Sequence, residues 1–70
     1  MPVTMFSVDS THITAIGYDD EQQALYIMFG PHTYLYHGVP TDLWERFKAA
    51  ESKGRFFREF IKGQYRGERQ

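Results

Sequence analysis

The chain has 70 residues, of which 41% are hydrophobic, no cysteine and a net charge of −1. This length suits one small domain, and the lack of cysteine excludes disulfide bonds and thiolate metal sites. No run approaches the roughly 20 apolar residues of a membrane span, and the first residues lack the charged region of a signal peptide. We therefore predict a single cytoplasmic domain over residues 1–70, with a core at residues 8–66, flexible termini and no membrane partner.

Two strands are predicted in the first part of the chain. Residues 10–18 are enriched in β-branched side chains, and we expect Ile13 and Ala15 to share one face. Residues 24–29 alternate with the period of two that is typical of a strand, and the polar residues 19–23 indicate a turn before them. Residues 1–9 are expected to form a loosely held arm or the lead-in to the first strand.

A third strand is predicted over residues 33–39, after a turn at Gly30-Pro31. If residues 30–33 form the loop, Phe29 lies opposite Tyr34, and Ile27 lies opposite Tyr36. Cross-strand partners share a face, so both tyrosines should lie on the face of Leu25, Ile27 and Phe29. The opposite face should carry Tyr26, Met28, Leu35 and His37.

A first helix should begin after Pro40, with Thr41 as its N-cap. Its apolar positions recur at the helical spacing and are Leu43, Phe47 and Ala50, with Trp44 beside them. Gly54 is suited to the left-handed position that follows the end of a helix. We therefore expect this helix to end at residues 52–54.

A second helix is predicted over residues 55–62, with Gly63 as its stop and residues 64–70 frayed. Its i, i+4 pairs are Phe56 with Phe60 and Phe57 with Ile61. A small isolated sheet is unstable in water, so the helices should cover one of its faces. The predicted fold class is α+β: a three-stranded antiparallel β-meander followed by two short α-helices packed on one face. The other face is open or covered by a partner.

The charges are distributed very unevenly along the chain. Residues 1–45 contain six acidic residues and no Lys or Arg, whereas residues 46–70 contain all eight Lys and Arg and three acidic residues. Such asymmetry is typical of contact with nucleic acid or a membrane surface. On an α-helix, Arg55, Arg58 and Lys62 share one face that can bind phosphates. A solvated helix face is the simpler explanation, and Glu59 weakens the patch. The candidate nucleic-acid-binding residues are Lys53, Arg55, Arg58, Lys62, Arg66 and Arg46.

Three tyrosines are candidates for aromatic contacts with a nucleic acid, because tyrosines on strands stack on bases in several RNA-binding folds. They are Tyr34, Tyr36 and Tyr26. The predicted register favours a different role for Tyr34 and Tyr36, since it places both on the face that the helices cover. Core packing is therefore the main expectation for these two.

The sequence offers no catalytic or metal-binding motif. The three histidines, at positions 12, 32 and 37, lack the spacing of metal ligands. The acidic residues 19–21 lack the ligand spacing of a calcium loop and are typical of a solvated turn. Ser52 is better explained as a cap residue than as a nucleophile. We predict no catalytic residue, no metal, no cofactor and no enzyme activity.

Four short motifs lie in order along residues 8–66. They are Ser10-x-x-Ile13-x-x-Ile16-Gly17-Tyr18-Asp19, Leu25-x-Ile27-x-Phe29, Tyr34-x-Tyr36-x-x-Val39-Pro40 and Ala50-x-Ser52-x-Gly54-x-Phe56-Phe57-x-x-x-Ile61-x-x-x-Tyr65. With these motifs the chain resembles the KTSC domain family, which includes stand-alone bacterial and phage proteins. Many members carry a Gly close before the first tyrosine of the pair, whereas here His32 and Thr33 intervene.

The resemblance implies a link to RNA, because the family is named for its occurrence at the C-terminus of some lysyl-tRNA synthetases. It supplies no catalytic residues. Together with the charge distribution, it predicts a non-catalytic nucleic-acid-binding module, with RNA favoured over DNA, that uses the basic C-terminal helical half. The alternative is a protein–protein interaction or homodimerisation module that uses the open sheet face.

Overall fold

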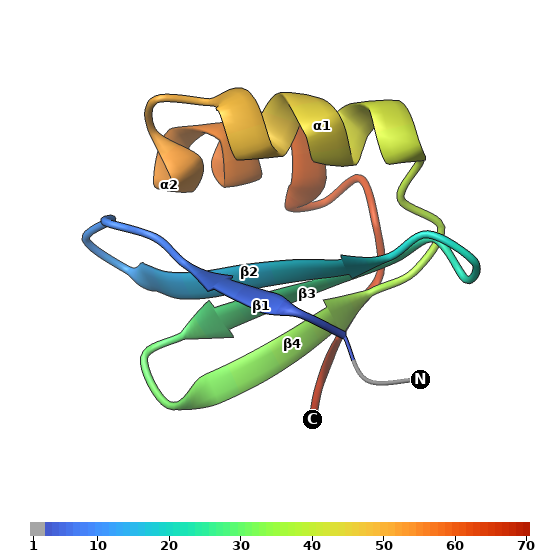
Figure 1. Cartoon of the computed structure of the whole chain (residues 1–70), viewed down its shortest axis with the longest axis horizontal. Coiled ribbons are helices and arrows are strands. Elements are labelled where there is room, and N and C mark those ends of the chain that lie inside the picture. The colour runs from blue at the N-terminus through green and yellow to red at the C-terminus, as the bar shows by residue number, and fades with distance from the viewer. Residues whose placement is uncertain (1–2) are drawn as a thin grey trace.

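The computed structural model describes residues 3–70, in which five strands form a single antiparallel sheet with helices on one face (Figure 1). The strands are β1 (Met5–Ser7), β2 (Ile13–Asp19), β3 (Ala24–Phe29), β4 (His32–Tyr36) and β5 (Gly67–Arg69). Their order in the sheet is β1-β2-β3-β4-β5, so each strand pairs with its neighbour in the sequence. The α+β class is confirmed, but the prediction of three strands is wrong.

The two additional strands lie at the edges of the sheet, and each depends on a glycine. A Cβ atom at Gly17 would lie 2.5 Å from the Met5 sulfur and 2.8 Å from the Thr4 carbonyl oxygen, so only glycine lets β1 pair closely with β2. A Cβ atom at Gly67 would overlap the ring of Tyr36, which leans over β5. Part of the expected N-terminal arm and part of the expected frayed tail are therefore sheet.

The β3–β4 hairpin is tighter than the sequence suggested. Phe29 pairs with His32, and Ile27 pairs with Tyr34, so the loop contains only Gly30 and Pro31. The positive φ of 60° at Gly30 is what a two-residue primed turn requires at its first position. The predicted register was therefore wrong by two residues. Because side chains alternate with period two, this error leaves the predicted faces unchanged.

A β-bulge in β2 changes the faces near its start. Ile13 pairs with Phe29 and Ala15 pairs with Met28, with an irregularity between them. The expectation that Ile13 and Ala15 share a face is therefore wrong. Ile13 lies on the helix-covered face and is fully buried, as is Ile16 after the bulge.

Helix α1 (Thr41–Ala49) begins directly after Pro40, which occupies the N-cap position without a side-chain hydrogen bond. Thr41 is the first helical residue, so the prediction that it is the N-cap is wrong. The helix also ends earlier than expected, because Ala50 is extended. Three side chains of α1 are buried against the sheet: Leu43, Trp44 and Phe47.

Helix α2 (Lys53–Phe56) continues directly into the π-helical segment η1 (Phe57–Ile61). Ser52 caps α2 by accepting a 3.2 Å hydrogen bond from the main-chain N–H of Arg55. Gly54 therefore lies inside α2, and the prediction that it terminates the preceding helix is wrong. The second helix nevertheless ends close to the expected position, and Gly63, with a φ of 80°, redirects the chain.

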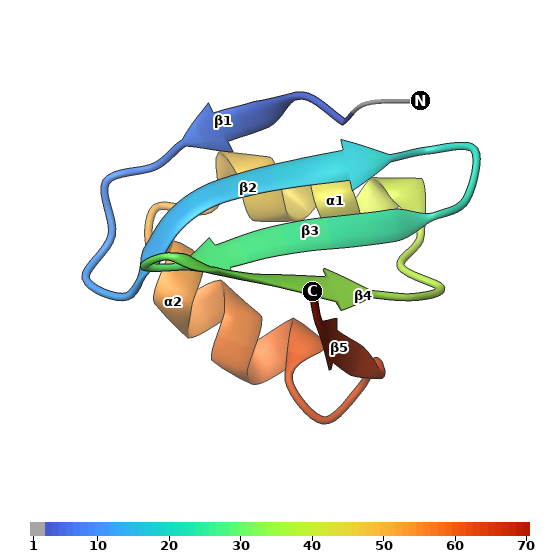
Figure 2. The ribbon, with the colours of Figure 1, turned by 90° about the horizontal axis from the view of Figure 1, so that it is seen from below.

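The core lies between the sheet and the helical layer. Figure 2 shows α1 behind β2 and β3, with α2 and η1 beside β4. The fully buried side chains come from both layers and include Ile13, Leu25, Ile27, Val39, Phe47 and Ile61. Within residues 3–70, helices cover only this face of the sheet (Figure 1). None of those helices has the length and apolar character needed to cross a membrane.

Candidate functional site

Five of the eight basic residues lie on or between α2, η1 and β5 at the β4 side of the fold, which we call the basic side: Arg55, Arg58, Lys62, Arg66 and Arg69. Lys48 lies instead beside Phe6 of β1. All eight lie in residues 46–70, on the second half of α1, on α2 and η1, and near β5. Figure 2 shows α2, η1 and β5 together at the β4 side of the sheet, with β1 at the opposite edge. The uneven charge distribution in the sequence thus becomes an uneven distribution in space.

Lys53 has a structural role that the sequence did not indicate. Its Nζ donates hydrogen bonds to the carbonyl oxygens of Lys48, at 3.0 Å, and Ala50, at 2.5 Å. These carbonyl groups lie at the C-terminal end of α1, where a helix leaves acceptors without internal partners. The ammonium group of Lys53 is therefore occupied inside the fold.

Two further candidate residues are partly engaged by neighbouring side chains. The Nε of Arg55 lies 3.1 Å from Oε1 of Glu59 in an exposed ion pair. The guanidinium of Arg46 lies over the ring of Phe60, 5.0 Å from its centroid, and 5.8 Å from that of Phe56. Both arginines remain exposed to solvent, but a phosphate that binds either of them would compete with these contacts.

Arg58, Lys62 and Arg66 are the candidates whose charged groups have no hydrogen-bond, ion-pair or cation–π partner in the described residues. All three are exposed, and none forms an ion pair within residues 3–70. Arg58 lies in η1, and Lys62 follows it, with its N–H donating to the carbonyl oxygen of Phe57 at 2.8 Å. The main chain of Arg66 is fixed beside β4, because its carbonyl oxygen accepts a 3.3 Å hydrogen bond from the N–H of His37.

The π-helical turn also alters the spacing of the basic residues. The shared face predicted for Arg55, Arg58 and Lys62 assumes an α-helical period throughout. In η1 the hydrogen bond spans five residues, so each turn contains an additional residue. This backbone geometry was not predicted, because no sequence signal in residues 57–61 separates it from an α-helix.

The candidate tyrosines divide between the two faces of the sheet. Tyr34 and Tyr36 lie on the helix-covered face, where the Tyr36 ring packs edge-to-face against Phe57 at 5.6 Å. Burial, and secondly the neighbouring Tyr34, raise the pKa of the Tyr36 hydroxyl. Tyr26 lies opposite Leu35 on the uncovered face and is half-buried. Tyr26 is therefore the one candidate tyrosine, among the described residues, on the open face.

The histidines on and next to β4 form pairs with residues of β5. His37 Nε2 lies 3.0 Å from Oε1 of Glu68, and Arg69 Nη2 donates to His32 Nδ1 at 2.9 Å. In the part of the chain that the structure describes, no three His, Asp or Glu side chains are grouped as metal ligands. The histidine contacts thus help to fix the last strand.

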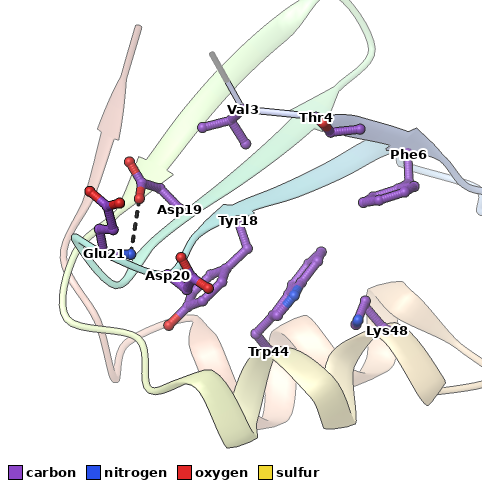
Figure 3. A pocket seen from close by; sticks show the side chains of 9 residues that line it. All are labelled: Val3, Thr4, Phe6, Tyr18, Asp19, Asp20, Glu21, Trp44 and Lys48. Atoms are coloured by element: carbon purple, nitrogen blue, oxygen red, sulfur yellow. Dashed lines mark hydrogen bonds between the residues drawn. The ribbon is translucent and has the colours of Figure 1, made fainter. Parts of the chain in front are cut away.

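A hollow of about 350 Å³, which no pattern in the sequence indicated, lies between β1, the β2–β3 turn and α1 (Figure 3). Its aromatic lining includes Tyr18 and Trp44, whose rings stack with centroids 5.3 Å apart. Three acidic residues, at positions 19–21, lie at one side of it. Only the acidic turn and the single Trp were visible in the sequence, and nothing there indicated that they lie together.

The chain folds into a small α+β domain in which one layer of helices covers the sheet. A KTSC domain protein from Yersinia pestis, known from a crystal structure, is 38% identical, with a TM-score of 0.94 over 99% of both chains. A Tsukamurella paurometabola protein is 43% identical over 63 residues, which cover 89% of this chain and 94% of the relative. An uncharacterised Stutzerimonas stutzeri protein is 33% identical over 60 residues, 84% of each.

The model of the KTSC domain matches residues 9–65. The chain therefore belongs to the KTSC domain family, as the sequence motifs indicated.

Proposed function

We propose that this KTSC domain is a non-catalytic nucleic-acid-binding module that prefers RNA to DNA. The observation that carries the proposal is that three cationic side chains of the basic side, those of Arg58, Lys62 and Arg66, are exposed and form no ion pair within residues 3–70. Lys and Arg side chains that have no internal partner can neutralise phosphates at little cost, and they release counterions when they do so. The preference for RNA rests on the occurrence of KTSC domains in some lysyl-tRNA synthetases.

Binding is proposed to use phosphate contacts rather than base stacking on the sheet. Tyr34 and Tyr36 lie under the helical layer, and the strand positions of the open face carry no Lys or Arg within residues 3–70. A strand on that face would have no cation for its phosphates. We therefore expect weak sequence preference and strong dependence on salt.

The test is a fluorescence anisotropy titration of the protein against a short labelled single-stranded RNA at several salt concentrations. Three phosphate contacts give a slope of log K against log salt of about −2, since each contact contributes about −0.7 with a single strand. The double variant Arg58→Gln/Lys62→Gln should reduce this slope to about −0.7. DNA of the same sequence should bind more weakly.

The matched control is Lys48→Gln/Arg69→Gln, which removes the same total charge from side chains that have partners inside the fold. Lys48 pairs with Glu45 at 3.0 Å, and Arg69 bonds to His32. This control should leave the slope near that of the unmodified protein. The proposal would be contradicted if the protein did not bind the RNA at low salt. It would also be contradicted if the salt slope decreased equally in the two double variants.

A second candidate function, homodimerisation, is favoured by the composition of the open sheet face. One row of cross-strand partners on this face carries apolar side chains that are half-buried although no helix covers them: Met5, Tyr26 and Leu35. Uncovered apolar surface commonly marks a protein contact. Sedimentation velocity should then show a concentration-dependent dimer that Leu35→Arg disrupts. A monomer at all concentrations would exclude this alternative.

A further inference from the structure

The hollow beside Trp44 lies away from the basic side and has the size of a small-molecule or side-chain site. Its volume is about 350 Å³, within the range of roughly 300–1,000 Å³ that is typical of ligand pockets. Figure 3 shows β1 on one side of it and α1 on the other, with Phe6 pointing from β1 toward the Trp44 and Lys48 side chains. The proposed nucleic-acid contacts use none of these residues.

The aromatic walls of the hollow present ring surface to a ligand. Tyr18 and Trp44 stack at an interplanar angle of 12°, while Phe6 is 51% exposed, which is unusual for so large an apolar side chain. The Nζ of Lys48 lies 5.3 Å from the centroid of the Trp44 ring. A cation thus already lies near this indole, in the arrangement of a cation–π contact.

Trp44 also presents a hydrogen-bond donor that has no partner in the described residues. Its side chain is only 6% exposed, yet no atom of residues 3–70 accepts a hydrogen bond from its indole N–H. Among residues 3–70 no fully buried polar side-chain atom lacks a partner, so this N–H keeps some contact with solvent, and Trp44 is one of the residues that line the hollow. A buried tryptophan usually finds an acceptor for this group. A hydrogen-bond acceptor on a ligand would give this N–H a partner.

The charge at the rim of the hollow is negative. Asp19 is occupied in the turn, where its Oδ1 accepts from the main-chain N–H groups of Glu21, at 3.1 Å, and Gln22, at 3.4 Å. Asp20 and Glu21 are exposed and form no ion pair within the described chain. Among the described residues of the lining, Lys48 is the one cation, and it is paired with Glu45. The rim therefore repels phosphates and attracts cations.

We propose that this hollow binds a basic peptide segment of a partner protein. An arginine or lysine side chain of the segment meets the carboxylates of Asp20 and Glu21 while its stem packs on the aromatic walls. A main-chain carbonyl of the segment accepts a hydrogen bond from the Trp44 indole N–H. This site goes beyond the proposed nucleic-acid contacts, and its ligand has the opposite charge.

The test is a titration with a triarginine peptide blocked at both ends, followed by the fluorescence of Trp44, the only tryptophan, and by the NMR signal of its indole N–H. The matched probe is the tricitrulline peptide, which keeps the shape and the carbonyl groups but lacks the charge. We expect a saturable change and a downfield indole proton shift with triarginine, and at least fivefold weaker binding of tricitrulline. Equal binding of the two peptides, or no saturable change, would overturn the proposal.

Two pairs of variants separate a local site from general attraction between charges. Asp20→Asn/Glu21→Gln should weaken triarginine binding by about fivefold, the effect of an exposed ion pair at the upper end of its range. Asp9→Asn/Glu51→Gln removes the same charge from loops outside the hollow and should leave binding unchanged. Equal losses in these two variants would show that only net charge matters and would overturn the proposal.

The second pair compares Phe6 and Phe60, the two large apolar residues that are exposed among residues 3–70. Phe6→Ala removes part of the aromatic wall and should weaken triarginine binding, whereas Phe60→Ala, outside the hollow, should not. Both variants change exposed positions, so both should fold. A loss with Phe60→Ala and none with Phe6→Ala would contradict the assignment of the site.

Discussion

The Tyr18 hydroxyl donates a 2.5 Å hydrogen bond to the main-chain carbonyl oxygen of Val39 and lies 3.3 Å from the Thr41 hydroxyl. The bond connects the end of β2 to the segment that leads from β4 into α1. Because Trp44 stacks on the same tyrosine, this contact fixes the start of α1 against the sheet. It also holds the aromatic wall of the hollow in place.

Replacing Tyr18 with Phe should therefore lower the free energy of unfolding by about 1 kcal/mol, the typical contribution of one hydrogen bond. Urea denaturation, followed by circular dichroism, measures the change. The matched control is Tyr26→Phe, because within the described residues the Tyr26 hydroxyl forms no hydrogen bond. Equal losses of stability in the two variants would contradict the assigned role of Tyr18.

Gly17→Ala should destabilise the protein by about 1–3 kcal/mol, the usual range for overpacking. The new methyl group would collide with a main-chain atom of β1, the carbonyl oxygen of Thr4, and not only with a movable side chain. Faster hydrogen exchange at the β1 amides should accompany the loss. Gly54→Ala provides the control, since its nearest atoms would lie 3.8 Å away and alanine favours a helix. That variant should be neutral or more stable.

The pH dependence of stability should contain a contribution from Tyr36. Burial and the neighbouring Tyr34 raise the pKa of its hydroxyl above the usual 10.0, so the folded state holds this proton more tightly than the unfolded chain does. The stabilisation is complete below pH 10 and decreases as the pH rises above 10 toward the pKa of the folded state. In Tyr36→Phe the loss of stability above that pH should be smaller. An identical alkaline profile in both proteins would contradict the prediction.

Lys53→Met should lower stability by about 1 kcal/mol, because it removes the donor for two carbonyl groups at the end of α1. It should leave the salt dependence of RNA binding nearly unchanged, because the ammonium group is already occupied. A reduced salt slope with unchanged stability would instead show that Lys53 contacts the RNA.

The central part of the fold could be predicted because its signals are local. The alternation of residues 24–29 and 34–36 placed Leu25, Ile27 and Tyr36 on the correct face even though the loop length was wrong. The prediction tolerated that error because a shift of two residues preserves the faces of a strand. The order of strands followed by helices gave the α+β class in the same way.

The edge strands and the hollow could not be predicted, because they depend on contacts between distant residues. Gly67 pairs with Tyr36 and lies under its ring, and no pattern in residues 64–70 suggests a strand. Similarly, the role of Lys53 depends on where α1 ends. The six candidate cations could be named from the sequence, but which of them have partners inside the fold became clear only from the packing of the helices.

An NMR titration of the isotopically labelled protein with a short single-stranded RNA tests the central claim most directly. The account predicts that the largest amide shifts lie in residues 58–66, around Arg58, Lys62 and Arg66, and that they diminish as salt is added. The open-face residues Tyr26 and Leu35 should shift little. Shifts concentrated on Tyr26 and Leu35, with residues 58–66 unchanged, would contradict the proposed nucleic-acid interface.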